Sequence, residues 1–302
     1  MPNYDFVTVD VFTEQRFGGN PLAVFPDARG LSDADMQAIA AEFNLSETTF
    51  VLPPDNPQHH ARVRIFTPRA ELPFAGHPNV GTGFVLAQRD PKPPEHYVFE
   101  EKAGLVRVHV LRGPDKAITG SRISAPRSLS VDIGIPDDTI ARCIGVEVSD
   151  VLTTAHTPLV ASVGTPFVIA ELRSVAVLSR ASPDLAAFRD AAERFSDAGT
   201  RFSLHLYARV DGSATHLRTR MFAPLGGILE DPATGSANAA LAALLTSLAP
   251  GGDVDLTYEI EQGVEMGRPS QIIASARKTP EGPVLATVAG SCVPVLRGSI
   301  TL

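Results

Sequence analysis

An acidic residue and a proline introduce the most apolar segment of the chain. Asp231 directly precedes Pro232, and residues 237–245 then hold a single polar side chain. Proline suits a first helical turn, and a helix without a polar face has to be buried. The N-terminus of such a helix carries unpaired amides and a partial positive charge, which suit an anion. The pattern predicts a buried helix that opens beside Asp231, Gly235 and Ser236, either as an anion site or simply as a capped core helix.

The same pattern occurs earlier in the chain. Gly76 and His77 precede Pro78, and a mostly apolar stretch follows at residues 79–88. His77, directly before this proline, is a candidate functional residue. The alternative is a histidine that caps the helix and packs on its loop.

The second half of the chain repeats the first. Residues 64–68 return as 220–224, 156 positions later, and His77-Pro78 returns as Asp231-Pro232, 154 positions later. Residues 19–24 return more weakly as 164–169. Three matches in the same order predict two similar domains.

Each half contains one apolar helix and several short strands. A sheet curled around such a helix is the arrangement that buries it. We therefore predict an α+β fold of two pseudo-symmetric domains, each a mixed β-barrel curled around a central helix. The polar run 113–126 places the boundary so that the domains are residues 1–118 and 119–302. The last strands, near 284–289 and 293–300, are free to join either domain.

Glu47 has no acidic counterpart in the second half. It directly precedes a β-branched run at 48–52, which predicts a strand. A shift of about 155 positions leads to the segment 201–203, which contains no acid. One extra carboxylate in a duplicated scaffold suggests a single general base, and a solvated loop glutamate is the alternative. Asn20, in a Gly-Gly-Asn-Pro sequence, is a turn residue in the simplest interpretation and a ligand contact in the second.

The repeat leads us to expect that the two helix N-termini face each other across a cleft between the domains, where small-molecule sites are common. Gly76 and His77 would lie on one side, with Asp231, Gly235 and Ser236 on the other. Amides at these helix ends would hold a substrate carboxylate or enolate. They would also stabilise charge that develops on a carbanion-like intermediate.

The composition excludes several classes of function. A net charge of −8 without a Lys/Arg cluster argues against nucleic-acid binding. The longest apolar run falls short of a membrane span, and no secretion signal is apparent, so a cytoplasmic protein is expected. Cys143 and Cys292 stand in unrelated contexts, which favours two buried free thiols over one disulfide. No His, Cys and acidic residues have metal-ligand spacing, so no metal is expected.

Together these stretches resemble the PhzF-like family, which shares its fold with diaminopimelate epimerase. The matching residues cover most of the chain: 9–12 with 17–24, 44–48, 66–68 with 74–78, 231–237, and 262–263 with 267–270. The resemblance implies the two-barrel fold, a site between the barrels, homodimers and no cofactor. It implies that Glu47 moves a proton between two carbons and that His77 and Asp231 bind and polarise the substrate. Gly235 and Ser236 would supply amides to its carboxylate.

The cysteine pair that racemises substrate in diaminopimelate epimerase is absent here, and neither Cys143 nor Cys292 lies in the matching loops. We therefore expect a cofactor-independent isomerase that moves a proton within a small carboxylate-bearing substrate. Glu47 would act as general base and then as general acid. Two alternatives remain: an epimerase of an amino or hydroxy acid that uses Glu47 and Asp231 as two bases, and a non-catalytic small-molecule binding protein on the same scaffold.

Overall fold

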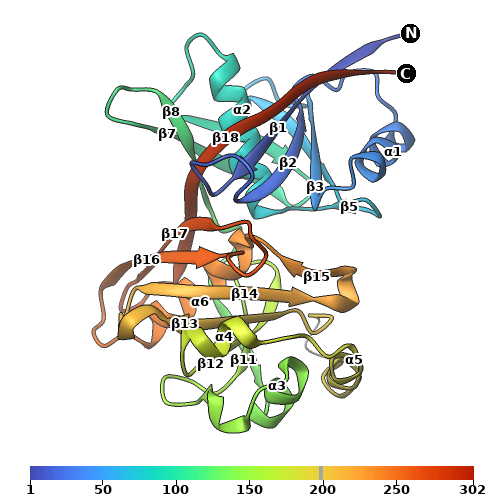
Figure 1. Cartoon of the computed structure of the whole chain (residues 1–302). Helices are drawn as coiled ribbons and strands as arrows, with labels where there is room; N and C mark the ends of the chain where they lie inside the picture. The colour runs from blue at the N-terminus through green and yellow to red at the C-terminus, as the bar shows by residue number, and fades with distance from the viewer. Residues whose placement is uncertain (197–199) are drawn as a thin grey trace. The chain divides into compact units, whose positions relative to one another are not determined.

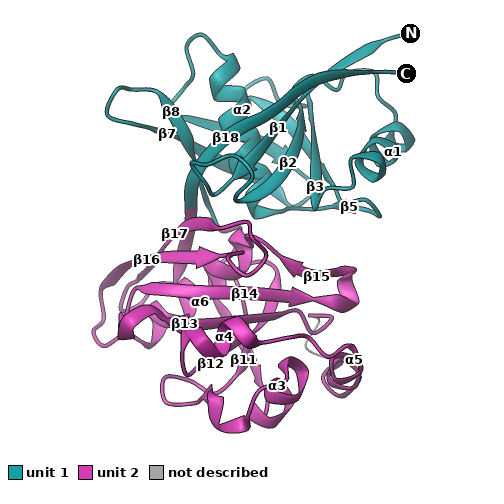
Figure 2. Cartoon of the chain, in the orientation of Figure 1, with its two compact units in different colours: residues 1–124, 289–302 teal, residues 125–288 magenta. Residues whose placement is uncertain are grey.

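The computed structural model describes residues 1–196 and 200–302. The chain divides into two compact units: unit 1 contains residues 1–124 and 289–302, and unit 2 contains residues 125–288 (Figure 2). The last strand, β18 (Leu285–Thr301), begins in unit 2 and ends in unit 1, where it pairs with β1 (Asn3–Val11). The C-terminal residues that the sequence left unassigned therefore complete unit 1.

Unit 1, in which every residue is described, closes eight strands into a mixed barrel. Besides β1 and the end of β18 they are β2 (Asn20–Phe25), β3 (Glu47–Leu52), β4 (Ala61–Phe66), β6 (His96–Glu101), β7 (Gly104–Arg112) and β8 (Ile118–Ser124). β2–β3 and β4–β6 are parallel, whereas β1–β2, β3–β4, β6–β7 and β7–β8 are antiparallel. Pairing of β8 with β18 closes the barrel. The short β5 (Glu71–Leu72) extends the sheet beside the end of β4.

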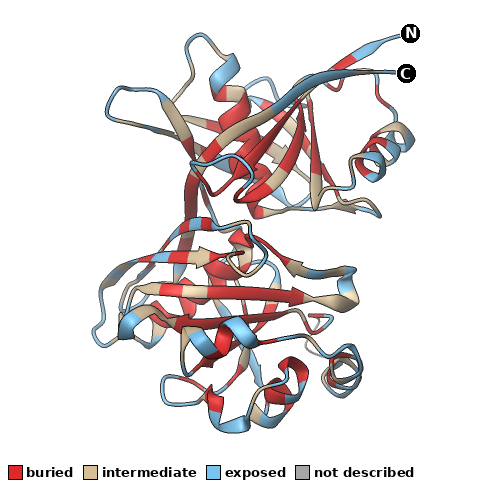
Figure 3. Ribbon diagram, viewed as in Figure 1, coloured by how far each residue is buried: buried red, intermediate tan, exposed pale blue. Residues whose placement is uncertain are grey.

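Helix α2 (Gly76–Arg89) fills the barrel of unit 1 and packs against β1, β2, β3, β7 and β8 (Figure 1). Almost all of its residues are buried, as its apolar composition predicts (Figure 3). Helix α1 (Asp33–Phe43) lies between β2 and β3 in the chain. It has a capping box of Ser32 and Asp35, and it ends at Asn44 in the left-handed conformation.

Unit 2 contains a second set of strands and more helices. The strands are β9 (Ser130–Gly134), β10 (Val151–Leu152), β11 (Leu159–Ser162), β12 (Pro166–Leu172), β13 (Leu204–Arg209), β14 (His216–Ala223), β15 (Ile228–Asp231), β16 (Val254–Gln262) and β17 (Ser270–Lys278). The helices are α3 (Asp137–Ile144), α4 (Val175–Arg180), α5 (Leu185–Arg194) and α6 (Gly235–Leu248), with 3-10 turns at Val148–Asp150, Val210–Gly212 and Pro224–Gly226. The sheet curls around α6, which is buried against β11, β12, β16 and β17.

The strand pairings confirm the internal repeat. In unit 2, β12–β13 is parallel, β13–β14 antiparallel, β14–β16 parallel and β16–β17 antiparallel. This is the order of β2–β3, β3–β4, β4–β6 and β6–β7 in unit 1. Arg64 lies opposite Phe50 and Arg220 opposite Leu206, so Arg64 and Arg220 are counterparts. The predicted α+β fold, with a mixed barrel around a central helix in each half, is confirmed.

The register corrects one of the sequence matches. On β4, Ile65 pairs with Leu72 of β5, and its counterpart Met221 on β14 pairs with Asp231 of β15. Leu72 is therefore the counterpart of Asp231. Four residues separate Phe66 from its partner Glu71, whereas seven residues, including the 3-10 turn Pro224–Gly226, separate Phe222 from its partner Glu230. This insertion shifts the repeat after β14.

The helix starts follow the same shifted register. α2 begins at Gly76 and α6 at Gly235, in each case four residues after the matched position of the short strand. His77 and Ser236 are then the second residues of the two helices. His77 is consequently the counterpart of Ser236, and its sequence match to Asp231 is wrong by five residues.

Candidate active site

Three of the residues proposed for the site come together in unit 1. Asn20 and Glu47 are the first residues of the parallel strands β2 and β3, so both lie at the same end of the barrel. His77, in the first turn of α2, reaches that end from the inside. Nε2 of His77 lies 3.3 Å from Oε2 of Glu47, and Nδ2 of Asn20 lies 3.3 Å from Nδ1 of His77. The side chains thus form a chain with the histidine in the middle.

Burial decides the charge of this histidine. His77 is only 5% exposed, and loss of hydration lowers the pKa of its ring from 6.5 to about 3. The ring is therefore neutral at neutral pH, and its contact with Glu47 is not an ion pair. Because the amide of Asn20 donates to Nδ1, the ring proton resides on Nε2, the nitrogen that faces Glu47.

The loop before β2 brings Asn20 to this position. Gly19 has φ +61°, and a Cβ atom there would lie 2.3 Å from the carbonyl oxygen of Val11. Only glycine therefore fits the turn. The backbone N–H of Phe17 donates to Oδ2 of Asp10 at 2.6 Å, which secures the start of the same loop. Asn20 is completely buried as a result.

The first turn of α2 lacks a side-chain cap. Its N-cap residue is Ala75, which cannot accept a hydrogen bond through its side chain. Gly76, the first helical residue, is buried. Nδ2 of Asn79 donates to the carbonyl oxygen of Ala75 at 3.0 Å and so fixes the turn from within the helix. The amides of this turn are donors of the kind that bind anions.

Asp231, Gly235 and Ser236 form a second group, in unit 2. Asp231 ends β15 and accepts a hydrogen bond from Oγ1 of Thr234 at 2.5 Å. Thr234 is the N-cap residue of α6, but its side chain does not cap the helix amides. Gly235 is buried and Ser236 half-buried in the first turn. This helix end also presents uncapped amides beside a carboxylate.

Gln262, which the sequence analysis did not propose for the site, organises this second group. Its Nε2 donates to the carbonyl oxygen of Asp231 at 2.8 Å and to Oγ1 of Thr234 at 3.1 Å. Its Oε1 accepts from the backbone N–H of Thr234 at 3.1 Å and from Nδ2 of Asn238 at 2.7 Å. The expectation that Pro232 opens the helix is wrong, because these bonds hold residues 231–234 outside α6.

The chain around Gln262 also supports that loop. Gly263 has φ +73°, and a Cβ atom there would lie 2.5 Å from the carbonyl oxygen of Pro232. Oγ of Ser270 donates to the same carbonyl at 2.9 Å. The sequence signal for these residues was present in the stretches 262–263 and 267–270, which carry part of the family resemblance.

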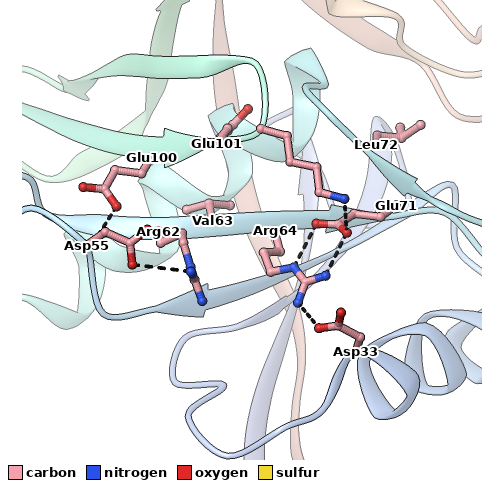
Figure 4. A pocket seen from close by; sticks show the side chains of 10 residues that line it. Asp33, Asp55, Arg62, Val63, Arg64, Glu71, Leu72, Glu100 and Glu101 are labelled. Carbon is pink, nitrogen blue, oxygen red and sulfur yellow. Dashed lines mark hydrogen bonds and ion pairs between the residues drawn. The ribbon is translucent and has the colours of Figure 1, made fainter.

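A pocket of about 480 Å³ lies elsewhere in unit 1, along β4, β5 and the end of β6 (Figure 4). Glu47, His77 and Asn20 are not among its lining residues. Arg64 binds Glu71 at 2.7 Å and Asp33 at 2.5 Å across it. Its charged groups are thus largely paired with one another.

The two cysteines take no part in either group. Both are buried free thiols, as predicted, and burial raises the pKa of Cys143 to about 12. Within residues 1–196 and 200–302, no cluster of three His, Cys or acidic side chains is arranged to hold a metal. Over the same residues, no helix combines the length and apolar character of a membrane span.

Comparison with known proteins assigns the chain to a family. The chain matches the family model of phenazine biosynthesis-like proteins, PhzC-PhzF, over residues 9–298. It is 39% identical to an uncharacterized isomerase of Mesorhizobium japonicum, with 99% of each chain covered. It is 38% identical to trans-2,3-dihydro-3-hydroxyanthranilate isomerase of Pseudomonas chlororaphis, covering 99% of this chain and 100% of that one.

A solved structure agrees on the fold. The crystal structure of a PhzF-family phenazine biosynthesis protein from Bacillus anthracis superposes with a TM-score of 0.87 at 24% identity, and 100% of both chains is covered. The family match spans both units and includes Glu47, His77 and Asp231. The chain therefore belongs to the PhzC-PhzF family of phenazine biosynthesis-like proteins and is an isomerase of that family.

Proposed function

We propose that this isomerase moves a proton within a small carboxylate-bearing substrate and that Glu47 carries the proton. The observation that supports this most directly is the arrangement in unit 1. A neutral His77 directs its Nε2 toward the carboxyl group of Glu47, 3.3 Å away, and Asn20 fixes the ring. A carboxylate beside a neutral donor can take a proton from one carbon and return it to another without a net change of charge.

The group in unit 2 supplies the complementary half of the proposal. The uncapped amides of Gly235 and Ser236 would hold the substrate carboxylate, and Gly76 would add an amide from α2. Asp231 would polarise the substrate together with His77. Because Glu47 has Ser203 as its counterpart in unit 2, only one half of the repeat provides the proton carrier.

The names of the Pseudomonas relatives suggest the first substrate to test. Trans-2,3-dihydro-3-hydroxyanthranilate carries a carboxylate, and its isomerisation can be followed by NMR in deuterated buffer. Glu47→Gln preserves size and polarity but cannot accept the proton, so we expect the rate to fall by roughly 10²–10⁴-fold. Ser203→Ala, at the matching position of unit 2, is the control and should leave the rate unchanged.

Exchange of the substrate hydrogen with deuterium from the buffer distinguishes the single-base isomerisation from a two-base epimerisation. A single-base shuttle returns part of the original hydrogen to the product, whereas two bases on opposite faces exchange it with solvent. Full activity of Glu47→Gln with this compound or a related cyclic carboxylic acid would remove Glu47 from the mechanism. Binding of these acids without turnover, unchanged by the substitution, would indicate a binding protein instead.

A homodimer remains a prediction from the family resemblance. Light scattering coupled to size exclusion tests it directly: a dimer has twice the chain mass of 32.0 kDa. A mass of one chain at micromolar concentration would contradict it.

A further inference from the structure

A series of hydrogen bonds connects Asp231 to the interior of unit 2. Oγ1 of Thr234 lies 2.5 Å from Oδ2 of Asp231 and 3.1 Å from Nε2 of Gln262. Gln262 bonds Asn238 at 2.7 Å, and Asn238 bonds His205 at 3.1 Å. The inner three residues are 0% exposed, Thr234 is 9% exposed and Asp231 is 7% exposed. Because buried polar groups are nearly always paired, the direction of each bond shows which atoms carry the protons.

The backbone fixes the orientation of the Gln262 amide. Its Oε1 accepts from the backbone N–H of Thr234 at 3.1 Å, and its Nε2 donates to the carbonyl oxygen of Asp231 at 2.8 Å. A backbone N–H can only donate and a backbone carbonyl can only accept. The reversed amide would place two donors together at one end and two acceptors together at the other. Nε2 therefore also donates to Oγ1 of Thr234.

Asn238 and His205 agree with this orientation. Nδ2 of Asn238 donates to the carbonyl oxygen of Thr234 and to Oε1 of Gln262, at 3.0 and 2.7 Å. Its Oδ1 therefore faces Nε2 of His205, which must be the nitrogen that carries the proton. Among the described residues, Nδ1 of His205 has no hydrogen-bond partner. Burial lowers the pKa of this ring from 6.5 to about 4, so a neutral ring with a bare Nδ1 is expected.

The hydroxyl group of Thr234 is left with one direction for its own hydrogen. Its oxygen accepts from Gln262, and within the part of the chain that the structure describes its acceptor is Oδ2 of Asp231. A proton on Oδ2 would remove this acceptor, and donation to an ionised oxygen is stronger than donation to a neutral one. Thr234 therefore favours the carboxylate form of Asp231.

The ion pairs of the adjacent strands lie on the other face of the sheet. Arg218 and Arg220 of β14 bind Glu261 and Glu230, at 2.5 and 2.8 Å. Asp231 directly follows Glu230 on β15 and projects to the opposite face, because strand side chains alternate. These arginines are thus directed away from Asp231, whereas the hydroxyl group of Thr234 supplies a donor on its own face.

Unit 1 shows that the fold does not need this pair of residues. Leu72 and Ala75 occupy the positions of Asp231 and Thr234, and α2 is nevertheless buried in its barrel. A buried polar pair costs hydration that its hydrogen bonds have to offset. Its presence in only one half of the repeat therefore indicates a role other than burial of the central helix.

We propose that Thr234 is a positioning residue whose hydroxyl group, directed by Gln262, holds Asp231 as a carboxylate in one orientation and withholds this acid from proton transfer. A group that takes and returns a proton has to change its protonation state readily, whereas Asp231 is held in one state. Glu47 is then the single proton carrier, and Asp231 polarises the substrate. This role rests on the function proposed above and disfavours the two-base epimerase.

Carboxyl NMR of the whole protein tests the hydrogen bond without a substrate. With ¹³C-labelled aspartate, the signal that is missing in Asp231→Asn should titrate at higher pH in Thr234→Val than in the wild type, by roughly one pH unit or more. Valine keeps the shape of threonine and removes the donor. Thr234→Ser keeps the hydroxyl group and should restore the wild-type midpoint. Thr234→Ala introduces the residue of unit 1, so it should raise the midpoint as valine does and serves where valine prevents folding.

Thr246→Val is the matched control. Thr246 is also a buried threonine of α6, and its hydroxyl group bonds that of Tyr258 at 3.1 Å. Its replacement removes a buried hydrogen bond but should leave the Asp231 midpoint in place. With the substrate named above, the acidic limb of the pH–rate profile should move with that midpoint in Thr234→Val and return in Thr234→Ser.

An equal Asp231 midpoint in the wild type and in Thr234→Val overturns the proposal, as does an equal rise in Thr246→Val. A retained rate in Glu47→Gln would refute the proposed reaction but would not alter these titrations, so the two failures can be told apart.

Discussion

Unit 1 and unit 2 share their strand pairings and their central helix, and they also share an arginine, which is half-buried in unit 1 and buried in unit 2. Arg64 and Arg220 each form two hydrogen bonds to a glutamate on the adjoining short strand, at 2.8 and 2.7 Å to Glu71 and at 2.8 and 2.8 Å to Glu230. Each guanidinium group also lies over the ring of a phenylalanine two residues later. The scaffold of the repeat is therefore duplicated down to individual contacts.

The two units differ where chemistry is proposed. In the repeat, the counterpart of Glu47 is Ser203 and the counterpart of His77 is Ser236. Asn20 of β2 has Thr165 as its counterpart, because Ala23 pairs with Thr48 and Val168 pairs with Leu204, the counterpart of Thr48. The polar residues at the strand starts of unit 1 thus have short hydroxyl side chains as counterparts in unit 2. The contacts that both units share are those needed for folding, whereas the residues proposed for the reaction lie at the strand ends, where the units differ.

The largest effect on stability is expected at the duplicated arginine. Arg220 also donates to the carbonyl oxygens of Leu178, Ser179 and Ala181, at 3.0, 3.3 and 2.7 Å. Arg220→Met would remove the charged partner of the half-buried Glu230 and a donor to these carbonyls, and it should lower the free energy of unfolding by about 3–5 kcal/mol. Arg64→Met should cost only about 1–3 kcal/mol, because Lys102 still neutralises Glu71. Denaturant unfolding measures both, and equal losses would contradict the ranking.

The next effect concerns activity. His77→Gln removes the neutral donor that faces Glu47 and should reduce kcat by about 10²-fold, the order observed for one positioned hydrogen-bond donor. Ser236→Ala changes the counterpart residue but keeps the backbone amide that is proposed to hold the substrate. Its rate should stay within about threefold of wild type, since that amide supplies the proposed interaction. If both variants lose activity equally, the two helix starts do not have the different roles proposed for them.

A sequence can reveal this duplication only where its spacing is constant. The offset of 156 positions from Arg64 to Arg220 holds across β3 and β4, and the apolar segments are sufficient to predict both buried helices. The capping box of Ser32 and Asp35 was also predictable, because it depends on residues close in the chain. These features are set by local pattern and burial.

The remaining features depend on contacts between distant residues. The sequence aligned His77 with Asp231 because a His-Pro and an Asp-Pro stand at similar spacing, but the longer turn after β14 displaces the register. The start of α6 is set by Gln262, 28 residues beyond Thr234. The equivalence of Glu101 and Gln262 is likewise visible only from strand register, because each directly follows the partner of a matched arginine, Glu100 opposite Arg62 and Glu261 opposite Arg218. No local pattern contains this information.

A smaller effect concerns pH and compares Thr49 with its counterpart His205. The hydroxyl groups of Thr49 and Thr82 form a hydrogen bond at 2.8 Å. His205 is fully buried, and burial lowers the pKa of its ring from 6.5 to about 4. At pH values between about 4 and 6.5, His205 is protonated in the unfolded chain but neutral in the folded chain. Stability is therefore complete above pH 6.5 and falls as the pH drops toward 4, by at most about 1.4 kcal/mol per pH unit.

His205→Thr, which introduces the residue of unit 1, should remove this component. The variant should show a shallower loss of unfolding free energy between pH 6.5 and 4 than the wild type, measured by urea unfolding at a series of pH values. His77, whose pKa is lowered to about 3, contributes in the same range and remains in the variant, so some slope persists. An unchanged slope would show that His205 is not excluded from protonation in the folded chain.

The smallest effects are expected at helix caps between the paired strands. In unit 1, Oγ of Ser32 accepts from the backbone N–H of Asp35 at 3.2 Å at the start of α1. In unit 2, Oδ1 of Asp184 accepts from the N–H groups of Ala186 and Ala187 at 2.8 and 3.0 Å at the start of α5. Ser32→Ala and Asp184→Ala should each cost about 1 kcal/mol. The caps share no partner, so the double variant should lose the sum. Separate denaturant transitions, each moved by one substitution only, would show instead that the two units unfold independently.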